Sequence, residues 1–224
     1  MANFLTVLRV ILAFITLGLL FCTPPNFQVS AAHQPALYIS AFFLTIFVIA
    51  LDGLDGYVAR KRNECTKLGS VLDILGDRIV ENAYWVAFAV LGWVGLWVPL
   101  VVLTRGIITD GLRSIALAEG YTAFGETSMI KNKIGNFITA SRFSRGAYGG
   151  AKALAFVLMI AANIPKLEEY NPMTVEHWYY FAYQIQPALQ IIAPALVYIA
   201  VIFCVARGIP VIIESKRFFS KNEQ

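Results

Sequence analysis

Six apolar stretches recur along the 224-residue chain, and all but the second are close to the length of about 20 residues that a helix needs to cross a membrane. They cover residues 5–22, 37–51, 71–91, 96–115, 147–164 and 185–205. The second stretch is expected to continue as a helix through Arg60. Pro187 and Pro194 lie within the sixth stretch, where neighbouring helices can satisfy the carbonyl groups that a proline frees.

The amino-acid composition points to lipid as the solvent of this chain. Hydrophobic residues make up 58% of it and charged residues only 14%, whereas soluble domains carry about 25% charged residues. We therefore predict an all-α, polytopic membrane protein with six transmembrane helices and a short cytoplasmic N-terminal element. The sequence contains no internal repeat or linker, so we expect residues 1–224 to form a single domain. The net charge of +4 fits cytoplasmic basic loops better than nucleic-acid binding.

The distribution of lysine and arginine predicts the orientation of the chain. The connections between the second and third stretches and between the fourth and fifth are rich in these residues, and so is the tail. Residues 24–36 and 92–95, on the opposite side, contain none. We therefore expect an integral protein of the cell membrane. The positive-inside rule then places both termini and the basic loops on the cytoplasmic side. Residues 117–145 are expected to form a cytoplasmic elbow, and residues 212–224 a short interfacial tail.

Four aspartates at the ends of the second and third stretches form the most informative pattern. Asp52 and Asp55 are spaced i, i+3, and Asp73 and Asp77 are spaced i, i+4. Each spacing puts the two carboxylates on one face of a helix. A turn over residues 61–70 could bring the two helices together in antiparallel order, and the four carboxylates would then meet at the cytoplasmic end.

Four clustered carboxylates need counter-charges. Two like charges about 5 Å apart repel by roughly 3 kcal/mol at an effective dielectric constant near 20. Closely placed oxygen ligands suit Mg²⁺, Mn²⁺ or Ca²⁺, and two such ions form a clamp for displacement at phosphorus. Instead of metal ions, Arg60, Arg62 and Arg78 could neutralise the carboxylates through salt bridges. A divalent-cation transporter is an alternative function for such a cluster, although transport sites are expected near the bilayer midplane.

The aspartates belong to a longer pattern that resembles a known family. The chain reads Asp52-x-x-Asp55-Gly56-x-x-Ala59-Arg60, then eight residues, then Gly69-x-x-x-Asp73-x-x-x-Asp77. Every fixed position and spacing resembles the signature of the CDP-alcohol phosphotransferase (CDP-alcohol phosphatidyltransferase) family. The resemblance implies an enzyme of phospholipid biosynthesis that transfers a phosphatidyl group from CDP-diacylglycerol to a small polar alcohol and releases CMP.

The resemblance also implies roles for individual residues. Two divalent metal ions, Mg²⁺ or Mn²⁺, would be held by the four aspartates, and Asp77 would also be the general base for the acceptor hydroxyl. The donor would be contacted by residues of the signature and of the N-terminal segment: Gly56, Ala59, Arg60, Thr66, Gly69, Asn3 and Thr6. Asn3 and Thr6 could equally be ordinary helix caps. A homodimer in the lipid membrane is expected by analogy with the family.

A phosphorylated acceptor would need fixed cations, for which we select Arg105, Arg113, Arg145 and Lys152. The segment from Arg105 to Arg113 is similar to one in the phosphatidylglycerophosphate synthase branch of the family, whose acceptor is glycerol 3-phosphate. Gly106 stands where that branch usually has an acidic residue. Glycerol 3-phosphate is therefore the first expectation, with an inositol phosphate or another polyol phosphate as the alternative.

Overall fold

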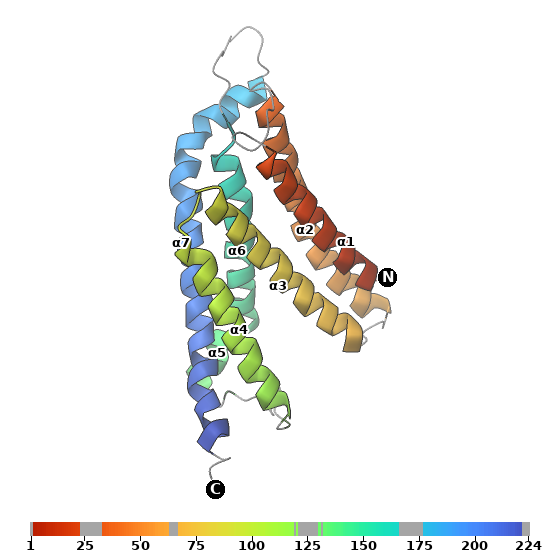
Figure 1. Ribbon diagram of the computed structural model, residues 1–224, viewed down its shortest axis with the longest axis vertical. Coiled ribbons are helices and arrows are strands. Elements are labelled where there is room, and N and C mark those ends of the chain that lie inside the picture. The colour runs from red at the N-terminus through yellow and green to blue at the C-terminus, as the bar shows by residue number, and fades with distance from the viewer. Residues whose placement is uncertain are drawn as a thin grey trace. The chain divides into compact units, whose positions relative to one another are not determined.

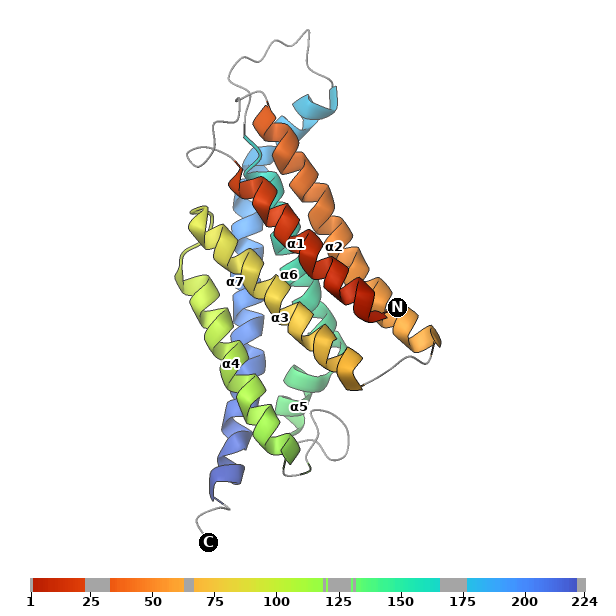
Figure 2. The ribbon, with the colours of Figure 1, turned by 45° about the vertical axis from the view of Figure 1, so that its right-hand side comes forward.

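The computed structural model describes residues 2–22, 33–62, 67–118, 120, 130, 132–165 and 177–220. Every regular element among these residues is a helix, as predicted. The helices, shown in Figures 1 and 2, are α1 (Ala2–Phe21), α2 (Gln34–Arg62), α3 (Lys67–Val90), α4 (Trp97–Ala118), α5 (Lys133–Ala140), α6 (Arg142–Ala162) and α7 (His177–Ser220). Six of them coincide with the six apolar stretches, and α5 lies within the expected elbow.

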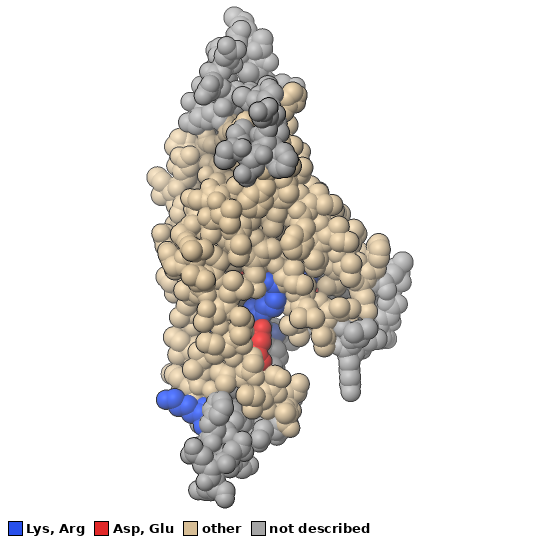
Figure 3. Space-filling model, in the orientation of Figure 1, with Lys and Arg blue, Asp and Glu red and all other residues tan. Residues whose placement is uncertain are grey.

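Within the described residues, three segments are long and apolar enough to cross a membrane: Asn3–Phe21, Gln34–Leu54 and Gln184–Lys216. Only about a third or less of the most apolar window in each is buried inside the protein. Large apolar side chains such as Phe43, Ile107 and Ile191 are exposed. In Figure 3, most of the described surface on the face shown is neither basic nor acidic. Such a surface is consistent with a membrane protein, because a soluble monomer rarely exposes large apolar patches.

Helix α7 is longer than the sequence predicted. It continues without interruption from His177 to Ser220, so the described part of the expected interfacial tail consists of its last turns. Pro187, Pro194 and Pro210 all lie within it. Prolines do not end this helix because packing against neighbouring helices can replace the hydrogen bonds that they remove.

The chain divides into two compact units. Unit 1 comprises Met1–Val94 and Ala153–Ala195, and unit 2 comprises Gly95–Lys152 and Leu196–Gln224. In unit 1, α1 packs against both α2 and α3. Helix α3 ends at a tight turn in which Gly92 has a φ of 75° and the amide of Trp93 donates to the carbonyl of Phe88. Glycine adopts this left-handed conformation without steric cost.

An aromatic cluster forms the core of unit 1. Tyr84, Trp85 and Phe88 of α3 surround Phe156 of α6, with ring centroids 4.8, 4.8 and 5.9 Å from that of Phe156. The hydroxyl groups of Tyr84 and Thr45 are 3.0 Å apart and form a buried hydrogen bond between α3 and α2. Burial of large rings together with a satisfied hydroxyl pair makes this contact specific as well as apolar.

Unit 2 has its own small core. Ala116, Ile130 and Val211 are buried together, and Leu112 packs against them. Helix α5 is capped by Asn132, whose side chain accepts a hydrogen bond from the amide of Ile134. Asparagine is a favoured residue at this position because its oxygen satisfies an otherwise free helix amide.

Candidate active site

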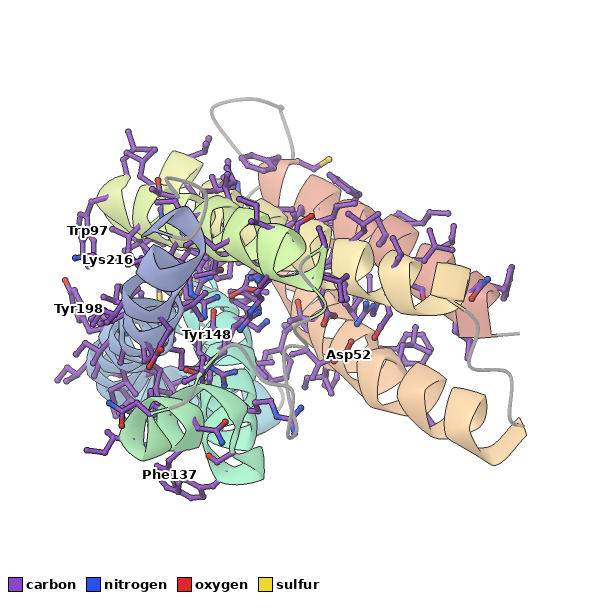
Figure 4. All side chains as sticks on the ribbon, turned by 90° about the horizontal axis from the view of Figure 1, so that it is seen from below. Asp52, Trp97, Phe137, Tyr148, Tyr198 and Lys216 are labelled. Atoms are coloured by element: carbon purple, nitrogen blue, oxygen red, sulfur yellow. The ribbon has the colours of Figure 1, made fainter. Side chains whose placement is uncertain are left out.

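The structure brings three of the four predicted aspartates together in unit 1. Asp52 comes from α2, and Asp73 and Asp77 come from consecutive turns of α3. One carboxylate oxygen of each lies within 4.8 Å of the other two. About half of each side chain is exposed. Asp52 is labelled in Figure 4, where it projects from α2 toward α3.

Close packing of α1 on α3 supports this acidic cluster, by which we mean Asp52, Asp73 and Asp77. Gly76 lies between the two α3 aspartates and is buried. A Cβ atom at Gly76 would lie 2.8 Å from Cγ2 of Thr6 and 3.1 Å from Nη2 of Arg9. A contact of 2.8 Å is shorter than real Cβ atoms make, so any other residue here would require Thr6 to shift.

Arg9 of α1 is the cation of the acidic cluster. Its side chain is only 3% exposed. Nη1 donates to Oδ1 of Asp77 at 2.9 Å and is also paired with Asp52, and Nη2 lies 3.7 Å from Oδ1 of Asp73. The guanidinium group therefore contacts carboxylates from two helices.

Sequence reasoning did not assign Arg9 to the site. The feature that could have indicated it is the position of an arginine inside the first apolar stretch, since a charge at that depth is costly unless it has a partner or a function. The sequence did not show which helices would pack against α1, so it could not identify the partner.

The donor set of the acidic cluster fits a divalent metal ion. Three carboxylates within 4.8 Å of one another supply the hard oxygen ligands that Mg²⁺ and Mn²⁺ prefer. The contacts of Arg9 show that the cluster accommodates a positive charge. Nε and Nη2 of Arg9 are buried without a hydrogen-bond partner, so the cation already in the cluster is incompletely satisfied.

The other predicted residues of this region are only partly described. The side chains of Asp55, Gly56, Ala59 and Arg60 in α2 lie outside the described residues, and so does all of Thr66. Gly69 lies in the first turn of α3.

Asn3 and Thr6 were expected in a short N-terminal element, either as donor contacts or as helix caps, and the structure places them differently. Both lie inside α1, which begins at Ala2, so neither precedes a helix as a cap residue does. Thr6 is instead buried against Gly76 of α3. The apolar pattern that predicted the first stretch extends to the start of α1, which explains why the helix includes them.

A second charged group, the basic cluster, lies in unit 2. Its centre is Arg207 of α7, and Arg105, Arg113 and Arg145 are near enough to act on it electrostatically. The ring of Tyr148 lies 5.5 Å from both the guanidinium carbon of Arg207 and Nζ of Lys152. All four residues predicted to bind the acceptor thus belong to this unit, around an arginine that the sequence analysis did not select.

Arg207 is buried and firmly held. Nη1 donates to the carbonyl of Ser144 at 2.9 Å, and Nη2 donates to the carbonyl of Thr139 at 3.2 Å. The next residue, Gly208, allows the side chain of Arg105 to pack closely against α7, because a Cβ there would lie 2.9 Å from Cγ of Arg105. Nε of Arg105 is buried and has no hydrogen-bond partner. Several cations in a small volume favour an anionic ligand.

The motif and its geometry agree with the comparisons with known proteins. The family model described as CDP-alcohol phosphatidyltransferase matches residues 1–206. The chain belongs to the CDP-alcohol phosphatidyltransferase family.

Three similar bacterial proteins carry the name CDP-diacylglycerol–glycerol-3-phosphate 3-phosphatidyltransferase. The protein from Mycoplasma genitalium is 33% identical over 123 residues, which cover 51% of this chain and 52% of the relative. The protein from Pseudomonas fluorescens is 33% identical over 126 residues, which cover 55% and 59%. The protein from Bacillus subtilis is 28% identical over 93 residues, which cover 42% and 48%. The matches therefore span about half the length of these relatives.

Proposed function

We propose that this protein transfers the phosphatidyl group of CDP-diacylglycerol to glycerol 3-phosphate and releases CMP, in phospholipid biosynthesis. The observation that carries the proposal is the acidic cluster, in which oxygens of Asp52, Asp73 and Asp77 lie within 4.8 Å of one another. Membership of the family and the name of the relatives from Mycoplasma genitalium and Pseudomonas fluorescens support the choice of donor and acceptor.

The acidic cluster would hold two divalent ions, Mg²⁺ or Mn²⁺, together with Asp55. Bound ions would screen the pyrophosphate of the donor and stabilise the charge that develops on the leaving CMP. Asp77 would take the proton from the acceptor hydroxyl, because an alcohol is a poor nucleophile until a positioned base removes its proton. Half of the Asp77 side chain is exposed, which leaves the carboxylate accessible to a soluble acceptor.

The remaining donor contacts are proposed from the signature. Gly56, Ala59, Arg60, Thr66 and Gly69 would bind the CDP moiety. Asn3 and Thr6 would act from α1. Thr6 is buried against Gly76 and so would influence the donor through the position of α1 rather than by direct contact.

The basic cluster of unit 2 would bind the phosphate of the acceptor. Arg105 is the strongest candidate, since its Nε is buried without a hydrogen-bond partner. Arg113, Arg145 and Lys152 would add charge, and Arg207 would hold the cluster together through the carbonyls of Ser144 and Thr139. Cations arranged in this way suit a phosphate better than a neutral alcohol.

We further propose that all of residues 1–224 act as one enzymatic domain with six membrane-spanning helices. Lysine and arginine placement supports a cytoplasmic location for both termini and the active site. The exposed apolar side chains would face lipid of the cell membrane or, in part, a second copy of the chain in a homodimer.

The test is CMP release from CDP-diacylglycerol by the purified protein in detergent. The acceptor panel comprises glycerol 3-phosphate, inositol 1-phosphate, inositol, serine and phosphatidylglycerol. We expect release with glycerol 3-phosphate, loss of release with EDTA, and recovery with Mg²⁺ or Mn²⁺. Release with inositol 1-phosphate alone would reassign the acceptor. No metal-dependent release with any acceptor would refute the proposal.

A further inference from the structure

Arg9 contacts every member of the acidic cluster. Nη1 donates to Oδ1 of Asp77 at 2.9 Å and pairs with Oδ1 of Asp52, and Nη2 lies 3.7 Å from Oδ1 of Asp73. These are oxygens of the same three carboxylates that form the candidate metal site. The guanidinium group already pairs with one oxygen of each carboxylate, so a divalent ion that used the same oxygens would compete with it.

The burial of Arg9 makes this competition strong. Its side chain is 3% exposed, and Nε and Nη2 have no hydrogen-bond partner. A buried cation with unsatisfied donors depends on its ion pairs for compensation. The guanidinium lies against Gly76 of α3, where an added Cβ would be 3.1 Å from Nη2, so the glycine leaves the room that this side chain occupies. A metal ion entering the cluster therefore meets a positive charge that is already paired with its ligands.

We propose that Arg9 is a positioning residue that serves as the resident counter-ion of the acidic cluster and must release Asp52 and Asp77 when a divalent ion binds. This inference rests on the proposed function, which supplies the metal ions. Arg9 holds the carboxylates of α2 and α3 together before the ions arrive. It also weakens the binding of metal alone, so that stable loading requires the anionic pyrophosphate of the donor.

The net charge around the cluster explains why metal binding should depend on the donor. A divalent ion loses attraction to carboxylates that are already paired, and it is repelled by the nearby guanidinium in a site that is only partly hydrated. The donor brings negative charge, which offsets this repulsion. Bound donor should therefore increase the affinity for metal, and bound metal should increase the affinity for donor by the same factor, because coupling between two binding sites is symmetric.

The test measures the dissociation constant of Mn²⁺ for the full-length, metal-stripped protein in detergent, from the electron paramagnetic resonance signal of free Mn²⁺. We expect Arg9→Gln to bind Mn²⁺ about ten-fold or more tightly than the wild type, because the competing charge is gone. Adding CDP-diacylglycerol should tighten Mn²⁺ binding in the wild type and much less in Arg9→Gln.

Two further variants separate this role from a structural one. Arg9→Lys keeps the charge and should retain a dissociation constant near that of the wild type. Thr16→Val alters a buried side chain on the same helix, whose hydroxyl donates to the carbonyl of Leu12, and should leave Mn²⁺ binding unchanged. Arg9→Met provides a second neutral variant if Arg9→Gln does not yield folded protein.

The outcomes distinguish the two proposals. Mn²⁺ binding that is equal or weaker in the neutral Arg9 variants would overturn the role of Arg9, while metal-dependent CMP release by the wild type would leave the proposed function standing. Saturable Mn²⁺ binding in none of the proteins, together with no CMP release, would overturn both.

Discussion

Gly76 of α3 lies so close to Thr6 of α1 that an added Cβ atom would be 2.8 Å from Cγ2 of Thr6. The contact lies between the two α3 aspartates in sequence and beside Arg9 in space. The spacing of α1 and α3 at this point therefore determines whether the guanidinium can reach the acidic cluster.

Gly76→Ala should separate α1 from α3 and destabilise the protein by about 1–3 kcal/mol, the usual cost of overpacking a close contact. CMP release should fall as well, because the site loses its alignment. The measurements are unfolding in detergent and initial rates. Gly18→Ala is the matched control in α1, where nothing lies within 4 Å of an added Cβ. Equal stability of the two variants would show that the close approach does not matter.

Asp77→Asn should lower kcat by about 10²- to 10⁴-fold, the range expected for loss of a general base. Binding of CDP-diacylglycerol should largely survive, because the other acids remain. Asp110→Asn is the control for kcat, since Asp110 lies in α4 of unit 2; because it pairs with Arg113 at 3.9 Å, the comparison is made at saturating acceptor. It should turn over normally. Normal turnover by Asp77→Asn would remove that residue from the role of base.

Arg105→Ala should raise KM for glycerol 3-phosphate by roughly ten-fold, since a hydrogen bond to a charged group contributes about 1.5–3 kcal/mol. The KM for CDP-diacylglycerol should change little. Lys216→Ala removes an exposed cation of the same unit and should leave both constants unchanged. An unaltered KM for glycerol 3-phosphate in Arg105→Ala would exclude Arg105 from acceptor binding.

Tyr84→Phe should destabilise unit 1 by about 1 kcal/mol, because it removes the hydroxyl that lies 3.0 Å from that of Thr45. Thr45→Val should have a similar effect, and the double variant should cost less than the sum, as expected for partners in one hydrogen bond. Neither variant should change KM for the acceptor. Fully additive losses in unfolding experiments would mean that the hydrogen bond is not formed.

Three of the four aspartates lie together as the sequence predicted, and Asp55 stays a prediction; for two of the three the geometry is local. A spacing of four residues on a helix puts Asp73 and Asp77 on one face, whatever the rest of the chain does. The position of Asp52 opposite them followed from an antiparallel pair of helices joined by a short turn. The all-helical fold followed similarly from the apolar stretches.

The cations that complete the two clusters could not be assigned in this way. Arg9 and Arg207 are far in sequence from the residues they contact, and only helix packing brings them together. Sequence alone shows that an arginine lies in an apolar stretch, but not which carboxylate or carbonyl satisfies it. The same limit explains α7, since its continuation past three prolines depends on neighbours that the local pattern does not reveal.

The most direct test of the central claim is to locate Mn²⁺ in crystals of the protein grown with CDP-diacylglycerol, using anomalous scattering. We predict Mn²⁺ peaks at about 2.0–2.4 Å from oxygens of Asp52, Asp73 and Asp77, a range typical of divalent ions bound to carboxylates, with the Arg9 guanidinium moved away from Asp52 and Asp77. Mn²⁺ bound elsewhere, with Arg9 still paired to those aspartates, would contradict the account.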